Sequence, residues 1–174
     1  MEFSTLSPAI EMGKLTLVLA ACAVILAPSV ALDCPFPFEM IGTQCLLFDT
    51  LESGSYYDMR LYCTRQEAGA TLAKIPSATQ LSEIIAYILK YGLDHSSYWI
   101  DASDDDVESY WRWSDGTSVP MGAPLWRYDC DEALTLRPAY DTTRNCAILD
   151  QESHYLIADT SCLDTNNPIC EVPL

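Results

Sequence analysis

Cysteine is the residue type in this sequence whose chemistry is easiest to predict. The 174 residues include 8 cysteines but only two histidines, His95 and His154. The cysteines form no C-x-x-C pair, and neither histidine lies at zinc-ligand spacing beside a cysteine. We therefore expect disulfides rather than a structural zinc site. Disulfides in turn indicate that the protein folds in an oxidising compartment.

A second group with chemical potential is the acidic run Asp104-Asp105-Asp106, followed by Glu108. Carboxylate oxygens are ligands that Ca²⁺ prefers. The run lacks the glycine and the terminal glutamate of an EF-hand loop. A calcium site of another kind and a solvated acidic turn both remain open.

The sequence contains no recognisable catalytic motif. It has no G-x-S-x-G, H-E-x-x-H or glycine-rich phosphate loop. Cys130 lies between Asp129 and Asp131, and neighbouring acids disfavour a nucleophilic thiolate. We therefore predict that the protein is not an enzyme.

Composition excludes two further classes. Nine Lys and Arg stand against 25 Asp and Glu, a formal charge of −16, whereas nucleic-acid binding requires a basic surface. Apolar residues make up 49% of the chain and charged residues 20%, which argues against disorder. The length predicts one domain with a substantial core.

The N-terminal segment, residues 1–31, is typical of a secretory signal peptide. Lys14 precedes a run over residues 15–26 that is apolar apart from Thr16, and small residues follow up to Ala31. Twelve helical residues span about 18 Å, too short for a hydrocarbon core of about 30 Å, so a membrane anchor is the poorer interpretation. We expect cleavage after Ala31 and a secreted, extracellular domain over residues 32–174, without a membrane partner. That domain carries seven cysteines and a formal charge of −15.

Two helices are predicted early in this domain. The first begins at Ser55 and ends near Gly69. The second begins at a capping box formed by Ser77 and Gln80, continues with apolar residues at helical spacing, and ends at Gly92.

Strands are predicted around residues 45–48, 98–113, 146–149 and 168–171, where apolar and aromatic residues replace the helical period. Residues 120–144 show little periodicity and many turn formers, which predicts a long functional or tethered loop. The pattern indicates an α+β domain.

The order of cysteines and tryptophans resembles the C-type lectin-like domain. The family's W-I-G-L motif is matched by Trp99-Ile100-Asp101-Ala102, and its W-x-W-x-D-G motif is intact from Trp111 to Gly116. The Val119-Pro120-Met121-Gly122 run is similar to secreted arthropod lectins, including crustacean ones. The resemblance implies two helices with antiparallel sheets and a long loop region, held by three disulfides. Their implied pairs are Cys34–Cys45, Cys63–Cys170 and Cys146–Cys162.

The resemblance also implies a sugar-binding calcium site, from which this sequence departs. The family's E-P-N or Q-P-D tripeptide is matched by Arg137-Pro138-Ala139, an expected glutamate is Arg144, and of the W-N-D motif only Asp159 remains. We therefore expect this calcium site to be lost. An alternative alignment brings other acids to this place, Asp129, Asp131 or Glu132, none of which adjoins a proline. The predicted ligand-binding residues are Arg137, Pro138, Ala139, Tyr140, Arg144 and Asp159.

By the same resemblance, Asp104 and Glu108 match an auxiliary calcium site of the family, with Asp141 or Asn145 as a further ligand. A solvated acidic turn remains the alternative. Cys130 is left over when the six framework cysteines pair. Because an exposed thiol does not persist in secretion, it predicts a disulfide-linked homodimer.

Two functions remain open. The first is a secreted pattern-recognition lectin of innate immunity that binds microbial or host glycans through a degenerate site. Its arginines would pair with anionic groups, and Tyr128, Tyr140 or Trp126 would stack on sugar rings, although packing within the loop is the expected role of Trp126. The alternative is a calcium-independent module that binds a protein partner, with Arg137 and Arg144 as interface anchors.

Overall fold

The computed structural model describes residues 33–128, 137–138 and 140–174. Two α-helices and a 3₁₀ turn lie in this part: α1 (Tyr56–Cys63), α2 (Ala78–Tyr91) and η1 (Gln151–Ser153). The strands are β1 (Glu39–Ile41), β2 (Gln44–Phe48), β3 (Thr71–Leu72), β4 (Tyr98–Ser103), β5 (Arg112–Trp113), β6 (Cys146–Asp150), β7 (Leu156–Thr160) and β8 (Asn167–Val172). The α+β class is as predicted.

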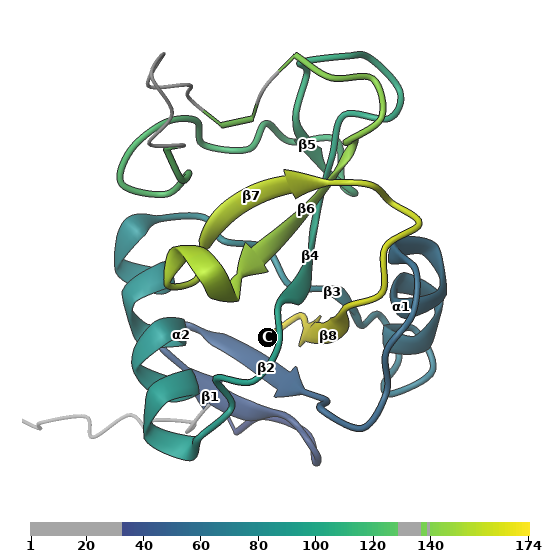
Figure 1. Ribbon diagram of the computed structural model, residues 1–174. Helices are drawn as coiled ribbons and strands as arrows, with labels where there is room; N and C mark the ends of the chain where they lie inside the picture. Colours follow the sequence, from purple (N-terminus) through teal and green to yellow (C-terminus); the bar gives the residue numbers. More distant parts are fainter. Residues whose placement is uncertain (1–32, 129–136, 139) are drawn as a thin grey trace, which may run out of the picture. The chain divides into compact units, whose positions relative to one another are not determined.

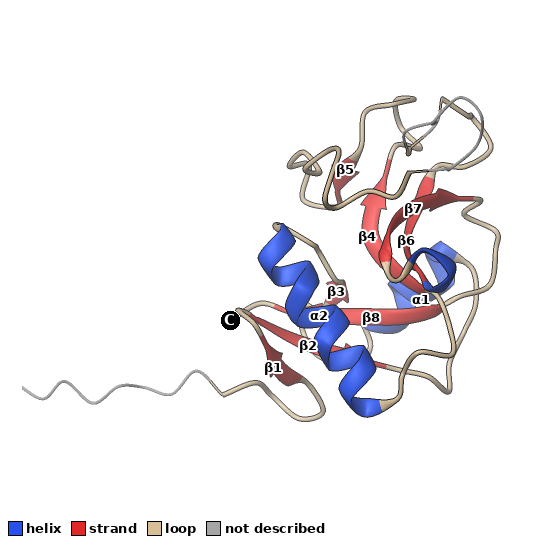
Figure 2. Cartoon of the chain, turned by 60° about the vertical axis from the view of Figure 1, so that its left-hand side comes forward, coloured by secondary structure: helices blue, strands red, loops and turns tan. Residues whose placement is uncertain are grey.

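The strands form one connected, mixed sheet. Its order is β1-β2-β8-β4-β6-β7, with β3 paired to β8 and β5 paired to β4. The named strands pair antiparallel, as expected, except that β4 and β8 run parallel where Tyr98 faces Asn167. There the C-terminal strand enters between β2 and β4. In Figures 1 and 2, α1 and α2 flank β8 on opposite sides, and the long loop region lies beyond the far end of β4.

The predicted ends of α2 are confirmed. The Ser77 side chain accepts a hydrogen bond from the Gln80 backbone N–H, and Gly92 ends the helix with φ +64°. By contrast, α1 begins after Ser55 as predicted but ends at Cys63, well before Gly69. Residues 64–69 form tight turns that bring β3 onto β8, so the helix cannot continue.

The tryptophans pack in the core and hold the long loop region. All four are at most 5% exposed. The Trp126 ring meets Trp111 edge to face with 5.1 Å between centroids, and its Nε1 donates to the Pro120 carbonyl at 2.9 Å. Trp126 is therefore a packing residue, as expected, and is not available to stack on a ligand.

The three expected disulfides are present. Cys34–Cys45 ties the N-terminal segment to β2, Cys63–Cys170 joins α1 to β8, and Cys146–Cys162 joins the start of β6 to the segment after β7. Cys130 and the predicted leader lie outside the described residues, so the homodimer and the cleavage stay predictions. No helix in the described ranges is long and apolar enough to cross a bilayer.

Candidate functional site at the long loop region

The centre of the predicted site is an ion pair between the long loop and β7. Strand β7 carries Asp159, whose side chain is fully buried. The Nη1 atom of Arg137 lies 3.2 Å from Asp159 Oδ2 and 3.5 Å from Oδ1. The Arg137 backbone N–H also donates to the Arg127 carbonyl at 3.2 Å. A guanidinium held in this way supplies the positive charge that a buried carboxylate requires.

The residues at this place do not fit the family's sugar-binding calcium. Ca²⁺ takes six to eight oxygen ligands, whereas Asp159 faces a guanidinium. A second cation at the same carboxylate would be repelled by Arg137. Pro138 follows Arg137 across a cis peptide bond, and Ala139 lies outside the described residues.

The second arginine of the predicted site also meets a carboxylate. Arg144 Nε lies 3.3 Å from Asp141 Oδ2. The other oxygen of Asp141 accepts from the backbone and the hydroxyl of Thr143. These bonds, the Thr143 hydroxyl first, hold the pKa of Asp141 below its usual range. Both oxygens of Asp141 are thereby engaged within its own turn of the chain.

The structure brings Arg144 and Asp159 to one polar cavity of about 360 Å³ on the β6–β7 side of the loop region. Its remaining polar lining comes from residues that the sequence analysis did not single out, namely Arg127, Thr143, Asp150, Thr160, Ser161 and Asp164. Arg127 pairs with Asp150 at 2.6 Å. Hydroxyls, carboxylates and guanidinium groups are the partners that sugar hydroxyls and anionic substituents require. No sequence pattern marks Arg127, because its partner Asp150 is distant along the chain and reaches it only through the fold.

Exposed aromatic side chains flank this region. Tyr140 is 80% exposed and Tyr128 is 46% exposed. Both rings offer apolar faces to a ligand, unlike the buried Trp126. Arg137 and Pro138 line a different, more apolar cavity with Met121 and Ser109. The six predicted residues therefore do not all line one cavity.

The acidic run provides oxygens that lack hydrogen-bond partners among the described residues. Asp104 is only 3% exposed. Its Oδ2 accepts from the Ser109 N–H at 2.7 Å, whereas its Oδ1, like the buried Oδ1 of Asn145, accepts no hydrogen bond within the described part of the chain. Burial raises the pKa of Asp104 to about 6, and the nearby charge of Glu108 contributes. Glu108 accepts from the Asp141 N–H at 3.1 Å.

These oxygens fit an auxiliary calcium ion in kind, because carboxylate and amide oxygens are its preferred ligands. Asp104, Glu108 and Asn145 would hold the ion, and the remaining ligands would be waters or backbone carbonyls. Among the described residues, no group of three or more His, Cys, Asp or Glu is arranged to hold a metal. The family interpretation and the acidic-turn interpretation thus both remain predictions.

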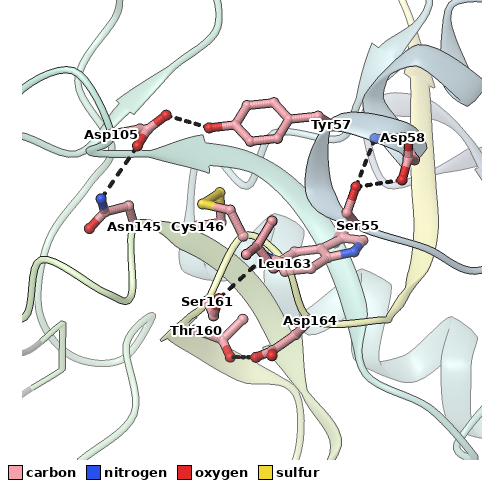
Figure 3. Close-up of a disulfide and its surroundings, with 12 residues drawn as sticks. Ser55, Tyr57, Asp58, Asp105, Asn145, Cys146, Thr160, Ser161, Leu163 and Asp164 are labelled. Carbon is pink, nitrogen blue, oxygen red and sulfur yellow. Dashed lines mark hydrogen bonds between the residues drawn. A yellow bond between two sulfur atoms is a disulfide. The ribbon is translucent and has the colours of Figure 1, made fainter.

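Figure 3 shows how this run is held to the rest of the domain. Asp105 accepts hydrogen bonds from the Tyr57 hydroxyl on α1 and from Asn145 Nδ2, the latter at 3.4 Å. Cys146, the next residue after Asn145, forms the disulfide with Cys162. Around Cys162, the Thr160 hydroxyl donates to Asp164. The start of β6 is therefore fixed from both sides.

Together, two helices flanking a mixed sheet, three disulfides and a long loop region define a C-type lectin-like domain. Residues 52–172 match the family Lectin C-type domain, and the chain belongs to that family.

The similar proteins have diverse names. A type-2 ice-structuring protein of Osmerus mordax is 26% identical over 141 residues, covering 81% of this chain and 72% of the relative. A snaclec of Philodryas olfersii is 29% identical over 109 residues, covering 62% of this chain and 67% of the relative. The carbohydrate-recognition domain of the mouse scavenger receptor C-type lectin is 26% identical with a TM-score of 0.60, covering 79% of this chain and 94% of that domain. The expected arthropod affinity stays a prediction.

Proposed function

We propose that this protein is a secreted pattern-recognition lectin of innate immunity that binds microbial or host glycans without calcium at the sugar site. The observation that carries the proposal is the pairing of Arg137 with the buried carboxylate of Asp159. In this proposal the guanidinium of Arg137 neutralises Asp159 in place of a calcium ion. The ligand then binds through hydrogen bonds to protein side chains and not through a metal. The proposal includes no enzymatic activity and no nucleic-acid or membrane partner.

The ligand of this proposal binds in the cavity lined by Arg144, Thr160 and Ser161. Sugar hydroxyls would exchange hydrogen bonds with the two hydroxyls, and Arg144 would pair with an anionic group, as found on lipopolysaccharide or teichoic acid. Tyr140, which is exposed and precedes Arg144 by four residues in the chain, would supply an apolar face to the ligand. Three disulfides in the domain support secretion, because such bonds persist in oxidising compartments.

The test is binding to immobilised lipopolysaccharide, lipoteichoic acid and a panel of neutral glycans, with calcium and with a chelator. We expect binding to at least one microbial glycan, unchanged by chelation and weakened about tenfold in Arg144→Gln. The matched control is Arg65→Gln, since Arg65 does not line the cavity. Loss of glycan binding on chelation would contradict the proposal.

Calcium at the auxiliary site is a separate part of the proposal. The oxygens of Asp104 and Asn145 that meet no hydrogen-bond partner in the described part of the chain support it. Calcium that binds the native state raises the unfolding temperature, and this rise should disappear in Asn145→Leu. If calcium raises the unfolding temperature of Asn145→Leu as much as that of wild type, the proposed calcium site is refuted.

The alternative function is a module that binds a protein. The exposed Tyr128 and Tyr140 support it, since tyrosine and arginine dominate interface hot spots. Absence of binding to every glycan, combined with capture of a partner that Tyr140→Ala abolishes, would favour this alternative.

We also propose that Cys130 links two copies of the chain. The secreted protein should then migrate as a dimer on a non-reducing gel, and Cys130→Ser should migrate as a monomer. Identical migration of the two would refute the linkage.

A further inference from the structure

A second cavity of about 390 Å³ lies between α1 and the segment that joins β4 to β5. It shares no lining residue with the cavity of the proposed function. Its lining includes Arg60 on α1, Arg112 on β5, the ring of Tyr110, and the carboxylates of Asp104 and Asp106. The volume is within the range of about 300–1,000 Å³ typical of small-molecule sites.

Neither of these arginines forms an ion pair with a carboxylate in the part of the chain that the structure describes. Lys74, Arg127, Arg137 and Arg144 each form an ion pair with an aspartate. Within the described residues, the Arg60 side chain makes no hydrogen bond or ion pair, and Arg112 donates to the Gly116 carbonyl at 2.7 Å but meets no carboxylate. In a chain with 25 acidic residues, two such guanidinium groups at one cavity leave donors available to an anion.

An aromatic ring lies beside one of these guanidinium groups. Tyr110 is 63% exposed, and the centroid of its ring is 5.7 Å from the Cζ atom of Arg112. The cation–π attraction favours a position of the exposed ring beside the guanidinium. The ring can therefore pack against the apolar face of a ligand ring.

The carboxylates at the same cavity narrow the class of ligand. A simple inorganic anion would be repelled by Asp104 and Asp106. A ligand that carries hydroxyl groups beside its anionic group would instead donate to these carboxylates while the arginines bind the anion. A sugar ring with an acidic substituent combines all three features, namely an anion, hydroxyl donors and an apolar face.

We infer that the cavity between α1 and β5 is a second binding site, for a pyranose that bears a carboxylate or a sulfate. Arg60 and Arg112 bind the anionic group, Tyr110 packs on the ring, and Asp106 accepts from its hydroxyls. The site works independently of Arg144 and Asp159. It gives one domain two separate contacts to an acidic polysaccharide.

The test is titration of the full secreted chain with methyl glucuronide, glucose 6-sulfate and methyl glucoside, followed by NMR. The glucuronide carries a carboxylate that the glucoside lacks, so this pair measures the effect of the acidic group. Comparison with glucose 6-sulfate shows whether the site prefers a carboxylate or a sulfate. We expect an acidic sugar to bind, the glucoside to bind at least tenfold more weakly, and Arg60→Gln and Arg112→Gln each to weaken acidic-sugar binding about tenfold. Arg65→Gln is the matched control, because Arg65 lies close to Arg60 in the chain but does not line the cavity.

Folding of each variant is checked by its unfolding temperature, since both arginines are exposed and should be replaceable without loss of the fold. Equal affinity for acidic and neutral sugars would overturn the inference. So would weakening of the acidic-sugar complex by Arg144→Gln alone, which would move the ligand to the cavity of the proposed function. If Arg144→Gln abolishes glycan binding while the glucuronide still depends on Arg60, both sites stand.

Discussion

Replacement of Arg137 by glutamine tests the ion pair on which the proposed function rests. The change removes the guanidinium 3.2 Å from Asp159 and leaves a fully buried carboxylate without its cation. Breaking a buried pair by removal of one partner costs about 3–5 kcal/mol. Because the Arg137 side chain is 12% exposed, water can reach it, and we expect the lower end, about 3 kcal/mol.

For a domain of this size, about 3 kcal/mol corresponds to a fall of about 10 °C in unfolding temperature. The assay is thermal and urea unfolding of wild type, Arg137→Gln, Asp159→Asn and the double variant. The double variant should lose less stability than the sum of the single changes, because neither charge is then left unpaired. Arg65→Gln, at a surface position, should unfold within about 0.5 kcal/mol of wild type.

Two results would refute this reasoning. One is a stability of Arg137→Gln that cannot be distinguished from that of the Arg65→Gln control, which would mean that the pair does not support the loop. The other is full recovery of the variant by millimolar calcium. Asp159 would then bind the metal once the arginine is gone, and calcium would fit the site after all.

Further predictions concern other parts of the domain. The pKa of Asp104 is raised to about 6 in the folded state, so its contribution to stability is full below its unfolded pKa and lost as pH rises through 6. The free energy of unfolding of wild type should therefore fall, relative to that of Asp104→Asn, as the pH rises from about 4 to 6. Urea denaturation with a chelator present measures this difference. Trp126→Ala should cost about 3–5 kcal/mol in the same assay, because the side chain is 1% exposed. Replacing Cys63 and Cys170 by alanine should cost about 4–5 kcal/mol, since the bond closes a separation of 107 residues.

The parts of the fold that follow local rules were predictable from the sequence. The ends of α2 depend on Ser77, Gln80 and Gly92, which lie within or beside the helix. The early end of α1 was not predictable in this way, because it depends on pairing of β3 with β8, which lies near the C-terminus. The parallel contact of β4 with β8 is non-local for the same reason. The disulfide pairs came from the family resemblance, as spacing alone permits many connectivities.

In the candidate site, too, the sequence indicates which residues are present, whereas only the fold shows which of them are in contact. In the sequence, Arg137 and Arg144 depart from the family pattern and Asp159 matches it. The sequence does not show which of these charges form ion pairs. Arg137 pairs with Asp159 on a distant strand, whereas Arg144 turns to Asp141 in the same turn of the chain. Asp101, in place of the motif glycine, is fully buried, and its carboxylate accepts from the backbone and hydroxyl of Ser114. Only the fold could reveal this partner.

The ion pair with Arg137 gives a physical reason for an acid at Asp159 in a site that we propose binds no calcium. A buried carboxylate is costly unless a positive charge accompanies it. Calcium supplies that charge reversibly, so a calcium site depends on the concentration of free ion. Arg137 supplies it from the chain itself, at a guanidinium that is always protonated and cannot be removed by a chelator. Under the proposed function, an arginine in place of the family's acid therefore provides one calcium ligand fewer and also supplies the positive charge that Asp159 requires.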